Sequence, residues 1–222
     1  MVGKCSMDRN SPDYYVESTE DAISSARDFV ESFPHLSAPA SASSSTPLVQ
    51  PILTPRMAIS TTAELLGALR DLAKSYDPPL PFQTHLSENE KEIAFTKSLF
   101  PECKTYAQVY DEFDLLGPGT ILAHCVHLEE EERRLISARG AGVSHCPTSN
   151  FHLGSGCARV REMLDSGINV GRNRSHEATA DSRLDWEAIV PADTRTASYL
   201  SFGLPRTSPI NTRTPQQHRI NH

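Results

Sequence analysis

A histidine and a glutamate three positions apart form the first candidate site in this sequence. His85 and Glu88 lie in QTHLSEN, where the imidazole ends a short apolar run and the carboxylate comes at the start of the next amphipathic stretch. A neutral imidazole can bind a metal ion, and a carboxylate at this spacing can reach a metal-bound water and move its proton. The alternative is a solvated His85, with Glu88 stabilising a helix N-terminus as acidic residues commonly do.

A second histidine ends the next apolar run. His124 lies in LAHCVH, and if the two runs are neighbouring parallel strands it points toward the same centre as His85. It would then be a second metal ligand or a group that orients a water. The alternative is an ordinary hydrogen-bonded histidine at a strand end. His127 follows one turn later, and we expect it at the surface.

Two further polar residues follow apolar runs. Arg56, in LTPRMAIS, can bring its planar fork of donors to a carbonyl or ring nitrogen of a ligand, and the alternative is a surface or ion-paired arginine. His145 lies in SHCPTSN, before the turn-forming residues Pro147, Ser149 and Asn150. We expect His145 to support the neighbouring loop and not to react.

Composition excludes several classes of function. The formal charge is −7, from 28 acidic and 21 basic residues, and it provides no basic surface for nucleic acid. No apolar run approaches the ~20 residues needed to cross a bilayer, and the N-terminus has no signal-peptide core, so we expect no membrane association and a cytoplasmic protein. The five cysteines form no CxxC pair, so we expect them to be reduced and mostly buried.

The elements that must position these residues alternate between short apolar runs and amphipathic stretches, a pattern typical of a parallel sheet wrapped by helices. Predicted strands cover residues 2–7, 48–53, 81–86, 120–124, 143–146 and 168–171. Predicted helices cover residues 18–33, 61–76, 89–100, 106–113, 129–139 and 157–166. Ser18 and Thr61 are predicted caps, and Gly140 can end a helix. The candidate residues thus lie where strands end, which is the ligand-binding face of parallel α/β proteins.

The number of residues per strand-helix step matches that of a (β/α)₈ barrel. Six strand-helix steps in about 170 residues fit a (β/α)₈ barrel, whose whole length is typically ~250 residues, with about two units fewer. A doubly wound open sheet would give the same alternation, and periodicity does not decide between the two. The low-complexity segment LSAPASASSSTP, residues 36–47, cannot bury enough apolar surface to repay ordering and is predicted to be a flexible insertion.

Five segments share their order and separations with a known family. They are VGKCSMD, LTPRMAIS, QTHLSEN, LAHCVHL and GAGVSHCPTSN. In this arrangement they resemble guanine deaminases of the amidohydrolase superfamily. The HxSE and HCPxSN motifs occur in other aminohydrolases of the superfamily, whereas VGK, CSMD and TPR together point more narrowly to guanine deaminase. The resemblance implies an incomplete (β/α)₈ TIM-like barrel over residues 1–171, the conversion of guanine and water to xanthine and ammonia, and a shared subunit interface as in a homodimer.

The resemblance also implies a role for each candidate residue. His85 and His124 would bind one zinc ion, with His124 orienting the hydroxide, and Glu88 would carry a proton from zinc-bound water to the purine ring. Zinc would lower the pKa of that water toward ~7. Arg56 and Met57 would hold the base beside His85 and Glu88. Another amino-substituted purine, a pyrimidine or a triazine stays open as the substrate, although Arg56 in TPR favours guanine.

The sequence departs from the family pattern in two places. Family members carry an HxH pair of zinc ligands on the first barrel strand and a zinc-binding Asp in GLGTD on the last. No HxH occurs in the 222 residues, and NVG at 169–171 is followed by RNRSH. We therefore expect a chain that lacks the N-terminal part and the usual C-terminus of the family, with zinc binding and turnover impaired, and a divergent, poorly ordered tail over residues 172–222. The alternative is a non-catalytic barrel fragment that binds purines or a partner subunit.

Overall fold

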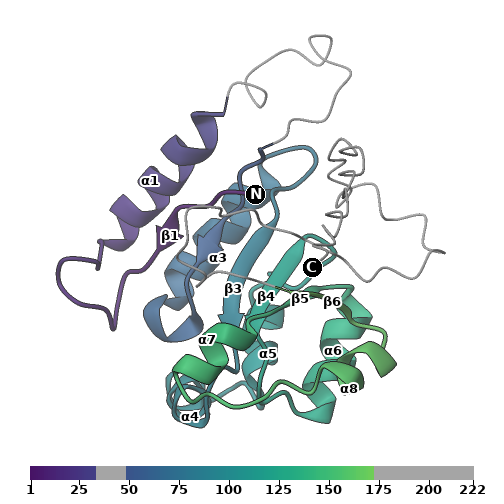
Figure 1. The fold of residues 1–222 in the computed structure, drawn as a ribbon. Coiled ribbons are helices and arrows are strands. Elements are labelled where there is room, and N and C mark those ends of the chain that lie inside the picture. Colours follow the sequence, from purple (N-terminus) through teal and green to yellow (C-terminus); the bar gives the residue numbers. More distant parts are fainter. Residues whose placement is uncertain (34–48, 173–222) are drawn as a thin grey trace, which may run out of the picture. The chain divides into compact units, whose positions relative to one another are not determined.

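The computed structural model describes residues 1–33 and 49–172 (Figure 1). The predicted insertion at 36–47 and the predicted tail after residue 172 lie outside these residues. The strands are β1 (Cys5–Ser6), β2 (Thr54–Pro55), β3 (Phe82–Leu86), β4 (Thr120–His124), β5 (Gly142–His145) and β6 (Asn169–Arg172). The helices are α1 (Thr19–Glu31), the 3₁₀ turn η1 (Ala58–Ser60), α3 (Ala63–Lys74), α4 (Glu90–Leu99), α5 (Tyr106–Glu112), α6 (Glu130–Arg139), α7 (Pro147–His152) and α8 (Val160–Asp165).

The order of the strands decides the architecture. Strands β3 to β6 pair in parallel in chain order, and β1 pairs in parallel with β2. A parallel bridge between Leu53 and Phe82 links the β2 segment to β3. A doubly wound sheet reverses its strand order at a switch point, whereas a barrel adds each strand beside the previous one. No reversal occurs within residues 1–33 and 49–172, so the fold is an incomplete barrel and not a doubly wound sheet.

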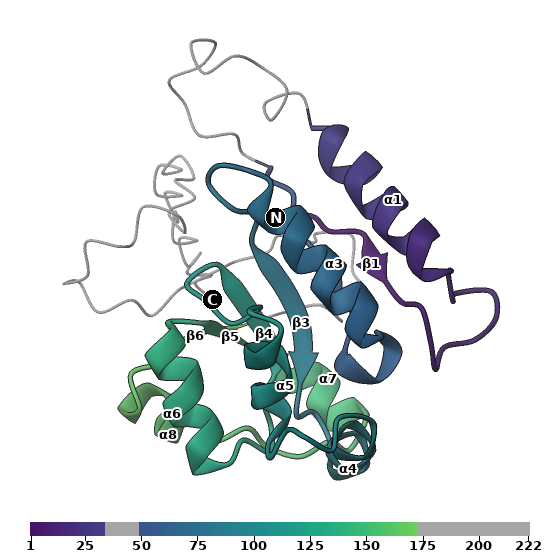
Figure 2. The same cartoon turned by 180° about the vertical axis from the view of Figure 1, so that it is seen from behind.

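Helices pack beside the strands through the apolar stripes that the sequence predicted. Helix α1 packs against α3, and α5 packs against α6 (Figures 1 and 2). Leu65, Leu66 and Leu69 of α3 are fully buried, as are Ala22 and Val30 of α1. Each buried leucine contributes about 1.5–3 kcal/mol relative to an exposed one. None of the helices in the described parts of the chain has the length and apolar character needed to cross a membrane.

The predicted cap residue is correct for α1 and off by one residue for α3. Ser18 caps α1, and its side chain accepts a hydrogen bond from the backbone N–H of Asp21, as predicted. The cap of α3 is Thr62, whose hydroxyl accepts from the N–H of Leu65, and not Thr61. Thr61 is buried and donates its hydroxyl to the carbonyl oxygen of Met57. The prediction was off by one residue because adjacent threonines satisfy the same capping pattern.

Two further boundaries differ from the prediction. Strand β2 follows the predicted run 48–53 and does not coincide with it, because pairing with neighbours fixes its position. Helix α7 replaces the predicted turn after His145, and Pro147 stands in its first turn, where a proline costs no hydrogen bond. Six residues are too short a stretch for helical periodicity to appear. Gly140 ends α6 in the left-handed conformation at φ 73°, as predicted.

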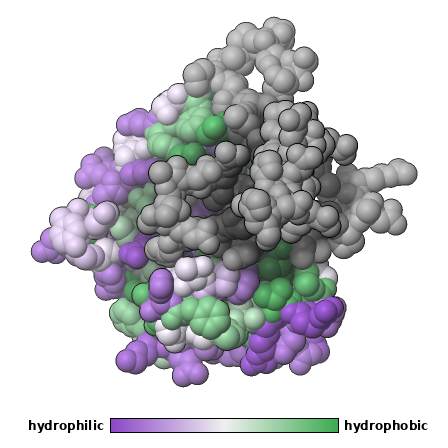
Figure 3. Space-filling view, in the orientation of Figure 1, coloured by the Kyte–Doolittle hydropathy of each residue, from purple (hydrophilic) through white to green (hydrophobic). Residues whose placement is uncertain are grey.

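The surface seen in Figure 3 includes hydrophobic residues over α7. Phe151 of this helix and Leu153, just beyond it, are mostly exposed, at 69% and 70%. Helix α7 lies with α4 beyond the carboxyl ends of the strands (Figure 1). This is the edge of the sheet where the candidate residues are found.

Candidate active site

The two candidate histidines lie side by side at the carboxyl ends of β3 and β4. In the parallel pairing of these strands, His85 lies opposite Ala123, and Leu86 lies opposite His124. Because both strands run in the same direction, both imidazoles reach the same edge. Their rings stack with centroids 5.0 Å apart and planes inclined by 24°. The structure thus brings together the two residues that the sequence singled out, and their roles stay predictions.

His85 is held by the segment that precedes η1. Its Nδ1 lies 2.7 Å from the carbonyl oxygen of Arg56, and its backbone N–H donates to the same oxygen across 3.0 Å. A carbonyl oxygen only accepts, so Nδ1 carries the hydrogen and Nε2 keeps its lone pair. Burial, and then the neighbouring His124, lower the pKa of His85 to about 4. His85 is therefore a neutral imidazole near pH 7, which is the form that binds metals.

His124 is buried and has an unusual backbone conformation. Its φ is 72° and that of Cys125 is 52°, so two consecutive residues that are not glycine adopt the left-handed region. The N–H of Cys125 donates to the carbonyl oxygen of Leu86, which holds the strained turn. Such strain costs of order 1–3 kcal/mol per residue and is concentrated at functional sites. The Nδ1 atom of His124 lies 2.7 Å from Oδ1 of Asn150 and 3.4 Å from Oε1 of Glu88.

Glu88 is buried at 9% exposure and turns its carboxylate toward His124. Its Oε1 accepts a hydrogen bond from the hydroxyl of Ser155 across 3.2 Å. The alternative role for Glu88 was to stabilise the start of the following helix, and there the capping hydrogen bonds are made by other side chains. Asn89 caps α4, and Glu92 completes the capping box by accepting from the backbone N–H groups of Glu88 and Asn89.

Arg56 and Met57 follow β2 and approach the histidines from another strand end. The guanidinium of Arg56 is exposed, and its Nη1 lies 3.6 Å from the sulfur of Met7. No carboxylate within residues 1–33 and 49–172 forms an ion pair with Arg56, so its exposed side chain agrees with the surface alternative and not with the ion-paired one. The carbonyl oxygen of Met57 accepts hydrogen bonds from Ser60 and Thr61. Arg56 thus contributes its carbonyl to His85 and leaves its side chain available.

A buried tyrosine supports the end of β3, and the sequence analysis missed it. The hydroxyl of Tyr110 donates to the carbonyl oxygen of His85 across 2.8 Å. It accepts from the N–H of Ala58 at 3.0 Å and from the hydroxyl of Thr84 at 2.9 Å. One hydroxyl therefore joins β3, η1 and α5. The available signal was the spacing of Tyr106 and Tyr110, which share one face of a predicted helix.

The segment after β5 also reaches the site. Asn150 contacts His124 and Ser155 contacts Glu88, although the sequence indicated only that Asn150 belongs to a turn. His127 was expected at the surface. It is half-buried, and its Nε2 lies 2.7 Å from the carbonyl oxygen of Ser155. No local pattern marks these contacts, because they join residues 26 to 67 positions apart.

The site supplies only part of a metal centre. The imidazoles of His85 and His124 are the right type of donor for zinc, but catalytic zinc sites usually have three protein ligands. In the part of the chain that the structure describes, no group of three or more His, Cys, Asp or Glu side chains is placed to hold a metal ion. The described residues therefore do not by themselves form a complete zinc site.

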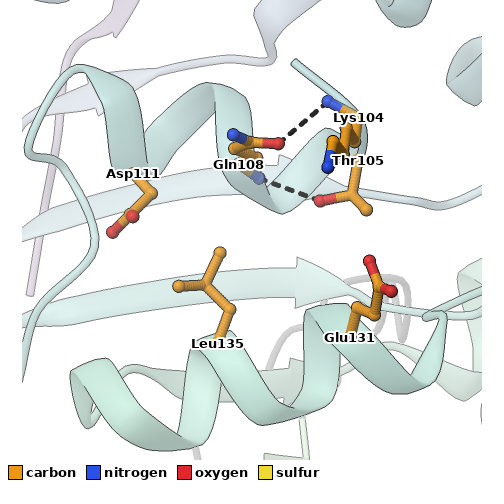
Figure 4. Close-up of a pocket in the computed structure, with 6 residues that line it drawn as sticks. All are labelled: Lys104, Thr105, Gln108, Asp111, Glu131 and Leu135. Carbon is orange, nitrogen blue, oxygen red and sulfur yellow. Dashed lines mark hydrogen bonds between the residues drawn. The ribbon is translucent and has the colours of Figure 1, made fainter.

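A separate pocket lies between α5 and α6 (Figure 4). It is lined by Lys104, Thr105, Gln108, Asp111, Glu131 and Leu135. Gln108 is fixed there by hydrogen bonds with the backbone N–H of Lys104 and the hydroxyl of Thr105. None of the residues that the sequence singled out lines this pocket, so the candidate active site is the edge that carries His85, Glu88 and His124.

Comparison with known proteins agrees with this geometry. Residues 1–172 match the amidohydrolase family. A probable guanine deaminase of Schizosaccharomyces pombe is 50% identical over 171 residues, which are 77% of this chain and 31% of that protein. Human guanine deaminase is 38% identical over 172 residues, 77% of this chain and 36% of that protein. The crystal structure of guanine deaminase from C. acetobutylicum with bound guanine has 40% identity and a TM-score of 0.69, covering 77% of this chain and 38% of that one.

The chain spans about a third of the length of these relatives. The amidohydrolase family consists of hydrolases that are generally metal-dependent. The match takes in all six strands and the helices of the described residues, and it extends over 172 of the 222 residues. The chain therefore belongs to the amidohydrolase family.

Proposed function

We propose that residues 1–172 carry part of the active site of a guanine deaminase, which converts guanine and water to xanthine and ammonia. One observation carries the proposal: the buried carboxylate of Glu88 lies 3.4 Å from His124, whose ring stacks on that of His85. The similarity to guanine deaminases, one of them with guanine bound, supports the choice of substrate.

The chemistry that this arrangement supports is proton transfer by Glu88. A water oxygen bonds to the ring carbon that carries the amino group, and one proton of the water passes to the Glu88 carboxylate and then to a ring nitrogen. The second proton of the water goes to the amine as the carbon-nitrogen bond breaks, which leaves a carbonyl and releases ammonia. Glu88 is suited to both steps because it is buried and because the hydroxyl of Ser155 donates a hydrogen bond to its Oε1 atom. A glutamate that is not a metal ligand has the same task in other nucleobase deaminases.

Arg56 is the residue proposed to recognise the guanine base through hydrogen bonds. A guanidinium offers two parallel N–H donors, which match the neighbouring O6 and N7 acceptors of guanine. Adenine carries an amino donor in place of O6, so it would lose one of these hydrogen bonds. Met57 would contribute an apolar contact beside Arg56.

The zinc ion that the family resemblance implies would use His85 and His124 as two of its ligands, and it would supply a Lewis acid that activates water. The two imidazoles that residues 1–33 and 49–172 provide are fewer than the three protein ligands of catalytic zinc sites. We therefore propose that zinc binding and turnover are impaired in this chain.

Guanine binding and ammonia release by the purified full-length chain test the proposal. We expect calorimetry to show guanine binding in preference to adenine and cytosine, and Arg56→Ala to lose the preference. Any ammonia released from guanine should fall by about 10²-fold or more in Glu88→Gln, because general acid-base catalysis is typically worth that factor. Equal binding of the three bases, or turnover that Glu88→Gln leaves unchanged, would contradict the proposal.

A second candidate is a non-catalytic, purine-binding barrel fragment. The incomplete set of metal ligands among the described residues favours it. Guanine binding that Arg56→Ala weakens, together with no ammonia release under any zinc concentration, would support this candidate over the enzyme.

A further inference from the structure

The segment between β5 and α8 reaches back across the strand ends to His124. Oδ1 of Asn150 lies 2.7 Å from Nδ1 of His124, and the side chain of Asn150 is 1% exposed. The backbone N–H of Ser155 donates to the carbonyl oxygen of Asn150 across 2.8 Å. Because the hydroxyl of Ser155 also donates to Glu88, the segment contacts the site at two points, Asn150 and Ser155.

Two oxygen atoms surround Nδ1 of His124. The amide oxygen of Asn150 is at hydrogen-bond distance, whereas Oε1 of Glu88, at 3.4 Å, is beyond the usual range for an N–H···O bond. An amide oxygen and an ionised carboxylate both only accept. This arrangement requires the hydrogen on Nδ1, which leaves a lone pair on Nε2.

The orientation of the Asn150 amide therefore decides which ring nitrogen of His124 carries the hydrogen. If the amide were turned around, its NH₂ group would donate to Nδ1, and the hydrogen of His124 would move to Nε2. In that form Nε2 could not accept a proton or bind a metal. Because Asn150 is buried, its side chain cannot turn to solvent, and its amide must face Nδ1 of His124 with either the oxygen or the NH₂ group.

We propose that Asn150 is a positioning residue that holds neutral His124 as the Nδ1–H tautomer, with the Nε2 lone pair available to the site. That the Nε2 lone pair takes part in the chemistry rests on the proposed function. The assignment of the tautomer does not. Asn150 would act through His124 and need not touch the substrate. Such outer partners commonly fix the tautomer of a ligating histidine.

Side-chain ¹⁵N NMR of His124 in the full chain, at a pH where its imidazole is neutral, tests this proposal. We expect the wild-type protein to show Nδ1–H. Asn150→Asp keeps an acceptor at this position and should keep that tautomer. Asn150→Leu removes the acceptor, and the ratio of tautomers should move toward Nε2–H by tenfold or more.

Backbone amide spectra establish whether each variant is folded, and Asn150→Ala replaces Asn150→Leu if the larger side chain prevents folding. A wild-type His124 in the Nε2–H form, or a folded Asn150→Leu or Asn150→Ala protein with the wild-type ratio, would overturn the proposal. The measurement needs neither guanine nor zinc. A failure of the proposed function, seen as absent guanine binding, would therefore leave the tautomer result standing.

Discussion

The hydroxyl of Tyr110, on α5, donates a hydrogen bond to the backbone carbonyl oxygen of His85, 25 positions earlier in the chain. The same oxygen of Tyr110 accepts from Ala58 and Thr84. Strand β3, which carries His85, and η1, which follows Arg56 and Met57, are thus joined to α5 by one buried hydroxyl. The position of the His85 imidazole depends on this network as well as on the strand that carries it.

Removing this hydroxyl should destabilise the protein. Tyr110→Phe removes the hydroxyl that donates to the carbonyl of His85 and leaves the buried N–H of Ala58 with only the longer hydrogen bond, 3.3 Å, to the hydroxyl of Tyr106, so we expect the free energy of unfolding to fall by about 1–3 kcal/mol. Denaturation with urea measures the loss. Tyr14→Phe is the matched control, since Tyr14 is 82% exposed, and it should change stability by less than about 0.5 kcal/mol. Equal effects of the two substitutions would argue against the network.

His85 should stay neutral well below the pH at which a free imidazole gains a proton. Its pKa is lowered from 6.5 to about 4, first by burial and then by His124. Between these two values the unfolded chain binds more protons, so the contribution of neutral His85 to stability is complete above pH 6.5 and is lost as the pH falls toward 4.

An NMR titration of the His85 ring checks this value directly. The unfolding free energy of His85→Gln, measured over the same pH interval, should depend less on pH than that of the wild type. A titration midpoint near 6.5 for the folded protein would contradict the expectation.

The buried carboxylate of Glu92 should contribute to the stability of the fold. It accepts hydrogen bonds from the N–H groups of Glu88 and Asn89, and burial raises its pKa. Glu92→Ala should lower the free energy of unfolding by about 1–2 kcal/mol, because the Glu92 half of the capping box is lost and the buried N–H of Glu88 loses this partner. Glu92→Gln keeps an acceptor oxygen and should lose less. Glu90→Gln, on the exposed side of the same turn, serves as the control, and a loss as large as that of Glu92→Ala would count against this role.

The metal content of the chain is a further prediction. After equilibration with zinc and removal of the unbound ion, the purified protein should retain well below one zinc per chain, because the described residues offer two proposed ligands, His85 and His124, where three are usual. Elemental analysis measures the content, and His85→Asn should lower what remains. One zinc per chain together with rapid ammonia release from guanine would refute the impairment.

Local features of the fold were predictable where short-range chemistry fixes them. Strand β4 has the predicted bounds, and Gly140 ends α6 in the predicted conformation. Ser18 caps α1 because its side chain meets an N–H only three residues away. The position of β2 and the presence of α7 were missed, since the first depends on pairing with distant strands and the second is too short for periodicity.

The sequence by itself determined the alternation of strands and helices, the caps, and the types of residue at the strand ends, because hydrophobic periodicity and capping act within one or two turns of chain. Only the tertiary structure decided that the strands follow one another without reversal. It also decided that His85 stacks on His124 and that Tyr110, Asn150 and Ser155 hold the candidate site. These contacts join segments that are far apart in sequence, and they arise from strand pairing and burial, which no local pattern encodes.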